Sequence, residues 1–204
     1  MTEWRKRCLG EITSFMSKGI PPKYVERENE NTVCVLNQKC NRNFEIKYEE
    51  SRLHDCSKKK VPADKMLQPG DVLINSTGTG TAGRVAQLYD VPTPTTIDGH
   101  MILLRPTEEI DSVYYGYAVK AFQPKIETLA EGSTGQTEIN RKRLQEEIVI
   151  SFPKETVTLI DNILYDCGKI LNFAAPKLSK AYSYAEKKGI AVTTTNKIKF
   201  ASSH

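Results

Sequence analysis

The sequence has no apolar segment long enough to cross a membrane. Its longest apolar runs, 72–74 and 101–104, are far shorter than the roughly 20 residues that a membrane-spanning helix needs. The first seven residues, Met-Thr-Glu-Trp-Arg-Lys-Arg, are not followed by the apolar core of a signal peptide. We therefore expect a cytoplasmic protein without a membrane partner.

Cysteine pairs with the spacing of metal ligands are also missing. The cysteines are odd in number and contain no Cys-x-x-Cys pair; they are Cys8, Cys34, Cys40, Cys56 and Cys167. This pattern favours neither a disulfide scaffold nor a zinc site, and Cys34 is expected to act as a small core hydrophobe. The sequence also lacks a Ser/His/Asp, Cys/His or paired-carboxylate arrangement with local support. We expect no metal, no cofactor and no catalysis.

Charge of one sign is present in only slight excess. The chain has 29 Lys and Arg against 25 Asp and Glu, a net charge of +4. This balance permits a polyanionic partner without requiring one, since strongly electrostatic nucleic-acid binders usually have a pI above about 9. The densest basic clusters are Lys-Lys-Lys at 58–60 and Arg-Lys-Arg at 141–143. Each cluster is open to two interpretations, a phosphate contact or solvated surface.

Short apolar runs separated by Gly and Pro predict a mixed α+β domain, mainly antiparallel, with peripheral helices. Residues 4–12 predict a strand or a helical turn, and 111–130 predict one helix from their helical spacing of apolar side chains. The polar stretch 38–65 is expected to be mostly exposed loop or edge structure. Strands are predicted from the β-rich runs at 32–36, 72–75, 84–88, 100–105 and 148–150.

The character of the sequence changes after Pro153. Residues 154–190 predict one long helix whose apolar positions alternate by three and four, as in an antiparallel coiled coil. A helix with so narrow a stripe must pack on its own domain or on a partner. The predicted organisation is therefore a domain at 1–153, a long helix at 154–190 and a polar tail at 191–204.

Residues 78–83, Gly-Thr-Gly-Thr-Ala-Gly, match the pattern Gly-x-Gly-x-x-Gly after a predicted strand. A dinucleotide site needs a helix next, whereas 84–88 has strand character and prolines follow closely. The Gly-Lys-Ser/Thr of a Walker loop is absent as well. The remaining interpretation is a hairpin link. Its hydroxyls and the following arginine either contact phosphate oxygens or satisfy only the local backbone.

A second segment, 132–141, has a similar composition: small and hydroxyl-bearing residues come first, and a basic residue ends it. Asn140 is expected to cap a helical turn at 141–145, because its side-chain oxygen can accept from the amides two and three positions on. Free amides at a helix start attract anions, and the side chains of Gln136 and Asn140 could instead pair with adenine. The alternative is a cap and a loop with no ligand.

Taken together, the segments 36–40 (Leu-Asn-Gln-Lys-Cys), 70–85 and 132–140 resemble, in this order, a known family. They look like the target recognition domain of type I restriction–modification specificity subunits. Weaker matches at 4–24 and 144–153 extend the resemblance over residues 1 to about 153. The long Gly/Thr motif carries most of its specificity.

The resemblance implies a subunit that reads a bipartite double-stranded DNA target and has no active site. Such subunits hold adenine methyltransferase (modification) subunits, which bind S-adenosylmethionine, and a restriction/translocase subunit can join them. This chain shows one recognition domain and one helix where the family normally has two of each. It therefore looks like a half-subunit, and a homodimer through 154–190 would read a palindromic split site.

The resemblance also suggests how the work is divided among residues. Shared Gly/Thr motifs are better candidates for framework and backbone contact, whereas base choice is expected from 40–60 and 89–99, including Asn43, Arg52 and His54. His100 is expected to be a hydrogen-bonded structural histidine. The predicted DNA-binding residues are Asn37, Gln38, Lys39, Arg42, Lys58, Lys59, Lys60, Ser76, Thr77, Thr79, Arg84, Ser133, Thr134, Gln136, Thr137, Asn140 and Arg141.

Two alternatives remain open from the sequence. The first is a stand-alone DNA-binding regulator, or an orphan recognition domain without a methyltransferase partner. The second, less favoured, is a small enzyme that uses a phosphate-binding loop.

Overall fold

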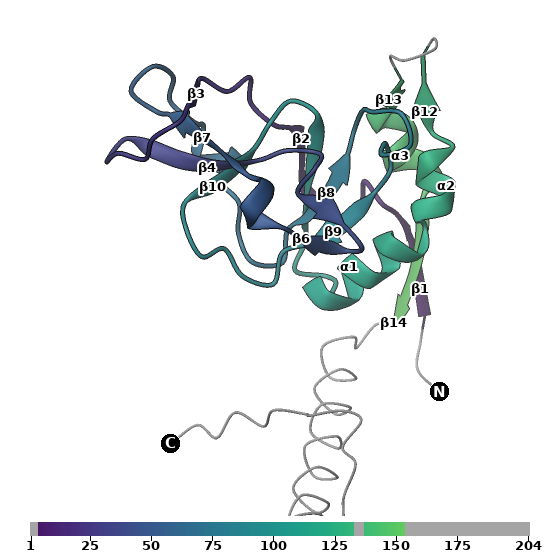
Figure 1. The fold of residues 1–204 in the computed structure, drawn as a ribbon. Coiled ribbons are helices and arrows are strands. Elements are labelled where there is room, and N and C mark those ends of the chain that lie inside the picture. The colour runs from purple at the N-terminus through teal and green to yellow at the C-terminus, as the bar shows by residue number, and fades with distance from the viewer. Residues whose placement is uncertain (1–3, 133–136, 154–204) are drawn as a thin grey trace, which may run out of the picture. The chain divides into compact units, whose positions relative to one another are not determined.

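A computed structural model describes residues 4–132 and 137–153, which form two four-stranded sheets with helices on one side (Figure 1). The central sheet is antiparallel throughout, with the order β2 (Thr13–Lys18), β11 (Met101–Pro106), β8 (Val72–Asn75), β9 (Val85–Gln87). The outer sheet has one parallel pair, β10 with β4, and the order β10 (Thr95–Ile97), β4 (Thr32–Leu36), β7 (Arg52–Asp55), β3 (Tyr24–Val25). The predicted α+β, mainly antiparallel class is confirmed for the described domain.

The central sheet is buried on both faces because its side chains alternate between two cores. Val72 and Ile74 of β8 face a core that is shared with the helices, and Leu73 between them faces a core that is shared with the outer sheet. A strand covered on both sides reads as a continuous apolar run. This explains why 72–74 is a continuous apolar run.

The helices cover one face of the central sheet and are α1 (Ser112–Ala121), α2 (Gln123–Glu127) and α3 (Arg141–Glu147). The prediction of one helix over 111–130 is wrong, because the helix is interrupted at Phe122. Asp111 caps α1 by accepting from the amide of Tyr114. Pro124 lies in the first turn of α2, where its missing N–H costs no hydrogen bond. The segment therefore restarts as a second helix.

The stretch 38–65 is more deeply integrated than its polarity predicts. It contains β7, which pairs on both sides, and the short elements β5 (Asn41–Arg42), β6 (Glu45–Ile46), η1 (Tyr48–Glu50) and η2 (Ala63–Lys65). Cys40, Asn41 and His54 are fully buried. The prediction of mostly exposed loop or edge structure is therefore confirmed for most of this stretch and fails for its buried residues.

His54 shows why the prediction failed. Its Nδ1 accepts from the amide of Lys23 at 2.7 Å, and its Nε2 donates to the carbonyl oxygen of Lys59 at 2.7 Å. Both ring nitrogens are thus hydrogen-bonded to the backbone inside the protein. The prediction that His54 reaches DNA is wrong.

The two ends of the domain meet in a two-stranded ribbon of β1 (Trp4–Cys8) and β14 (Val149–Pro153) (Figure 1). Trp4 lies opposite Pro153 in this antiparallel pair. The amide of Leu9 continues the ribbon by donating to the carbonyl oxygen of Ile148 at 2.8 Å. The opening segment is therefore a strand, one of the two structures predicted for it.

The predicted long helix at 154–190 and the polar tail at 191–204 lie outside the described residues. Within the part of the chain that is described, no helix is long and apolar enough to cross a membrane.

Candidate functional site

The Gly-rich loop 78–83 joins two antiparallel strands. β9 returns alongside β8, with Val72 opposite Gln87, so the predicted hairpin is confirmed and no helix follows the loop. Gly83 has a φ of +87°, and a Cβ there would lie 2.6 Å from Cγ and 2.9 Å from Cα of Glu127. The glycine thus lets α2 pack closely against the loop. At this position the pattern reflects packing, and not the approach of a nucleotide.

The two Gly/Thr segments lie side by side although they are far apart in sequence. The amide of Ser76 donates to the carbonyl oxygen of His100 at 2.8 Å, and the amide of Ile139 donates to the carbonyl oxygen of Ser76 at 2.7 Å. Thr77 forms an antiparallel bridge with Glu138 in β13 (Glu138–Ile139). Ser76 itself is fully buried. Its side chain is thus not exposed for the predicted DNA contact, and its backbone links the residue before β11 to β13.

A cavity of about 560 Å³, here called the motif pocket, lies where these segments meet. It brings together five residues predicted from the sequence and four that were not. Its lining residues are Asn37, Gln38, Lys39, Thr77, Gly78, Asp98, His100, Thr137 and Glu138.

A hydrogen-bond chain crosses the motif pocket. Gln38 Nε2 donates to Thr77 Oγ1 at 2.6 Å, and Thr77 Oγ1 lies 2.9 Å from His100 Nδ1. The Thr77 hydroxyl thus connects the amide of Gln38 to the ring of His100. His100 is hydrogen-bonded, as expected, but it is exposed and lines the cavity.

Asp98 is the most buried charged group of the motif pocket, with 5% of its surface exposed. Its Oδ1 accepts from the amide of His100 at 2.9 Å, and its Oδ2 accepts from the hydroxyl of Tyr24 at 3.4 Å. Burial raises the pKa of Asp98, and the hydrogen bond from His100 partly offsets this rise. The guanidinium of Arg52 stacks 3.4 Å above the ring of Tyr24. The guanidinium of Arg52 thus packs on the side chain of Tyr24.

The chemistry of the motif pocket suits base edges better than phosphates. Carboxylates repel phosphate but accept hydrogen bonds from the amino group of cytosine, and side-chain amides can pair with adenine. The pocket contains Asp98, Glu138 and the amide side chains of Asn37 and Gln38. Sequence reasoning missed both carboxylates. The one available signal was the position of Asp98 inside 89–99, a stretch expected to choose bases.

A second cavity, of about 290 Å³, lies on the other side of the hairpin loop and is here called the cationic pocket. Two of its basic residues, Arg42 and Arg84, were predicted to bind DNA. Lys120 was missed because α1 carries no recognisable motif. The lining residues are Asn41, Arg42, Asn43, Phe44, Arg84, Val85, Lys120 and Gln123.

Asn140 caps α3, as predicted. Its Oδ1 accepts from the amides of Lys142 at 3.1 Å and Arg143 at 3.2 Å, and its Nδ2 donates to Glu131 Oε2 at 2.9 Å, in β12 (Ala130–Glu131). The polar atoms of Asn140 and these two amides of the helix start are thus occupied. The cap prediction is therefore confirmed, and the base contact of Asn140 and the anion site at the helix start stay predictions.

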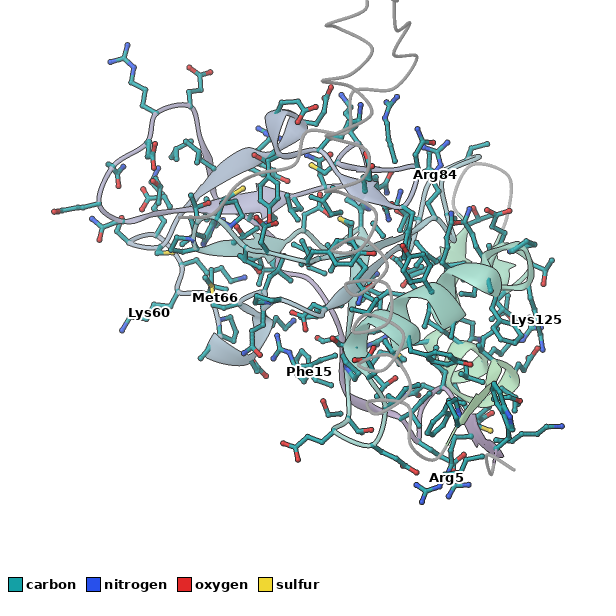
Figure 2. The ribbon with its side chains drawn as sticks, turned by 90° about the horizontal axis from the view of Figure 1, so that it is seen from below. Arg5, Phe15, Lys60, Met66, Arg84 and Lys125 are labelled. Carbon is teal, nitrogen blue, oxygen red and sulfur yellow. The ribbon has the colours of Figure 1, made fainter. Side chains whose placement is uncertain are left out.

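The remaining predicted residues lie outside both pockets. Arg141 and Thr79 are exposed, as are the three lysines of 58–60, of which Lys58 lies 3.7 Å from Asp55. Figure 2 shows Lys60 and Arg84 on opposite sides of the domain. The predictions for Ser133, Thr134 and Gln136 fall on residues outside the described part of the chain.

Comparison with protein-family models identifies one family. Residues 1–194 match the model of the type I restriction modification DNA specificity domain. No curated protein is significantly similar in sequence to this chain.

Several solved structures are similar in fold. An S subunit of a type I restriction-modification system from M. genitalium has 18% identity and a TM-score of 0.48, over 90% of this chain and 46% of that one. The HsdS subunit from Thermoanaerobacter tengcongensis has 20% identity and a TM-score of 0.52, over 83% and 39%. A structure described as the basis of complex assembly and conformational transition of the type I R-M system has 18% identity and a TM-score of 0.52, over 92% and 43%. The chain spans less than half the length of each.

Proposed function

Because the chain belongs to the family of type I restriction modification DNA specificity domains, we propose that it is the non-catalytic recognition component of a methyltransferase complex. In this role it selects a double-stranded DNA sequence and needs no cofactor of its own. The methyltransferase subunits would bind S-adenosylmethionine and modify adenine.

The motif pocket is the observation that carries this proposal. It joins three sequence motifs that are separate in the chain, and it presents amide, hydroxyl, imidazole and carboxylate groups on one cavity. Such a mixture can match the donors and acceptors at the edges of bases. Asp98 adds a residue from a variable-looking stretch to the shared framework of Gln38 and Thr77. We assign base choice to Asp98 and positioning to the framework.

The proposed partners follow from family membership. They are duplex DNA, adenine methyltransferase subunits and, where cleavage occurs, a restriction/translocase subunit. Pairing of two copies through residues 154–190 would present two recognition domains to one DNA. A two-fold pair of identical domains reads two identical half-sites in opposite orientation. The proposed target is therefore a palindromic sequence split by a spacer.

Co-expression of the full chain with the adenine methyltransferase encoded beside it tests the proposal. We expect the two to purify together and cellular DNA to carry methyladenine in one split, palindromic motif. An otherwise identical culture expressing Asp98→Asn should lose methylation at that motif or shift it to another. Sequence-preferring duplex binding without a methyltransferase partner would favour the stand-alone regulator instead. A folded chain that binds no duplex would contradict DNA recognition altogether.

A further inference from the structure

The cationic pocket gathers three positive side chains, none of which lies within ion-pair distance of a carboxylate in the described part of the chain. Within the described residues, Arg42, Arg84 and Lys120 take part in no ion pair, and no acidic residue lines the cavity. Each is held instead by a neutral acceptor. Arg84 Nη2 donates to the carbonyl oxygen of Gly80 at 3.1 Å, and Arg42 Nε donates to that of Lys39 at 3.4 Å.

Lys120 is positioned by a side chain from the next helix. Its Nζ donates to Gln123 Oε1 at 2.6 Å, and the same oxygen accepts from the amide of Val85 at 3.1 Å. Gln123 therefore ties the end of α1 to the first residue of β9. This contact places the ammonium group of Lys120 at the cavity that Arg84 lines from the hairpin.

The base of the cationic pocket is rigid. Asn41 is completely buried, and its Nδ2 donates to the carbonyl oxygen of Arg84 at 2.9 Å. Asn43 and Phe44 then turn the chain with φ values of 56° and 68°. The pocket is thus assembled from three separate parts of the chain: the β5–β6 turn, the start of β9 and the α1–α2 junction.

Two chain segments run from the motif pocket into the cationic pocket. Residues 37–39 line the first cavity and 41–44 the second; likewise Thr77 and Gly78 line the first and Arg84 the second. A group bound in the cationic pocket is therefore fixed in position relative to the motif pocket. Contacts to the sugar–phosphate backbone set the register in which bases are read.

We propose that the cationic pocket binds one phosphate of the DNA backbone and that Lys120, outside every sequence motif, supplies one of its charges. The proposal rests on the proposed function and names the part of the DNA that this cavity takes. Three cations around one small cavity would attract the single negative charge of a phosphodiester whatever the base attached to it. The pocket thus anchors the backbone while the motif pocket reads the sequence.

The test is the salt dependence of duplex binding by the full chain, measured with Lys120→Gln. Removing one phosphate contact should weaken binding about fivefold at 0.15 M salt, for preferred and unrelated sequences alike, and lower the slope of log K against log salt by about 0.9. Lys120→Arg should restore both values. Lys125→Gln is the matched control, because Lys125 lines neither pocket and lies in the adjacent helix. It should leave the slope unchanged.

Arg42→Gln provides a second reading on an exposed side chain, in case Lys120→Gln folds poorly, and should lower the slope similarly. If duplex binding is intact and neither variant changes the slope, the phosphate pocket is wrong while DNA recognition stands. If inorganic phosphate stabilises the wild-type chain but not Lys120→Gln, and the duplex slope is unchanged, the pocket takes free phosphate and the assignment to DNA is overturned. A folded wild-type chain that binds no duplex overturns both proposals.

Discussion

The motif pocket and the cationic pocket share two chain segments but differ in charge. The motif pocket sets the carboxylates of Asp98 and Glu138 beside Lys39, and Glu138 is itself paired with Lys18 at 2.7 Å. The lining of the cationic pocket that the structure describes has positive charge only. A uniform positive surface attracts every DNA sequence equally, whereas mixed donors and acceptors distinguish bases. The two proposals accordingly assign attraction and selection to neighbouring but separate residues.

Gly83→Ala should have the largest effect, because it should damage the motif pocket and the cationic pocket at once. The substitution forces a side chain into a left-handed backbone conformation and against the backbone of α2, at an expected cost of about 3 kcal/mol in the free energy of unfolding. Urea denaturation measures this loss. Gly80→Ala is the control, since Gly80 has a φ of +70° but open space around it, and it should cost about 1 kcal/mol. Equal losses would show that packing of α2 against the loop is unimportant.

Asp98→Asn should separate selection from attraction. The variant keeps the shape of the side chain but replaces an acceptor by a donor. Discrimination against at least one base should therefore change by about 1–3 kcal/mol, with the salt slope unaltered. Selection from a random duplex library, run in parallel with Lys120→Gln, measures this. The same preferred sequence for Asp98→Asn and the wild type would contradict the assignment of base choice to Asp98.

The pH dependence of stability should further distinguish the motif pocket from the cationic pocket. Burial raises the pKa of Asp98 above its ordinary value of 3.8, so the folded chain binds this proton more tightly than the unfolded chain. Between pH 3.8 and the raised pKa, the contribution of Asp98 to stability should therefore fall as pH rises. Urea midpoints across this window should decline less steeply for Asp98→Asn. Arg42→Gln and Lys120→Gln should show the same dependence of the urea midpoint on pH as the wild type. A changed dependence would show that charges in the cationic pocket affect the titration of Asp98.

Replacing the three lysines at 58–60 by glutamine should have the smallest effect. These side chains are exposed and line neither pocket. Their attraction for DNA is therefore screened over about 8 Å at physiological salt. We expect at most about a twofold loss of duplex affinity at 0.15 M salt and a larger loss at low salt. A large, salt-independent loss would place a direct contact at this cluster.

Local signals in the sequence predicted the elements that local interactions determine. The hairpin around 78–83 follows from its Gly-rich link between two apolar runs, and the cap by Asn140 depends only on amides two and three residues away. The order of the motifs carried the family resemblance. These features need no knowledge of the tertiary structure.

The predictions that failed depend on partners from distant parts of the chain. His54 looks like an exposed polar residue until the backbone of Lys23 and Lys59 satisfies its ring. Ser76 is buried by segments near His100 and Ile139, which no local pattern brings together. Lys120 reaches its pocket through a contact between two helices and a hairpin. Pattern alone carries no information about which distant segments meet.

The β1–β14 ribbon has a consequence for how such a domain can diverge. Trp4 and Pro153 are direct partners, so the points where the chain enters and leaves the domain are about 5 Å apart. The rest of the domain lies in sequence between these two paired strands. Loops between β1 and β14 can lengthen, shorten or be replaced without separating these two strands. The ribbon thus allows the surface between its two strands to change while Trp4 and Pro153 stay paired.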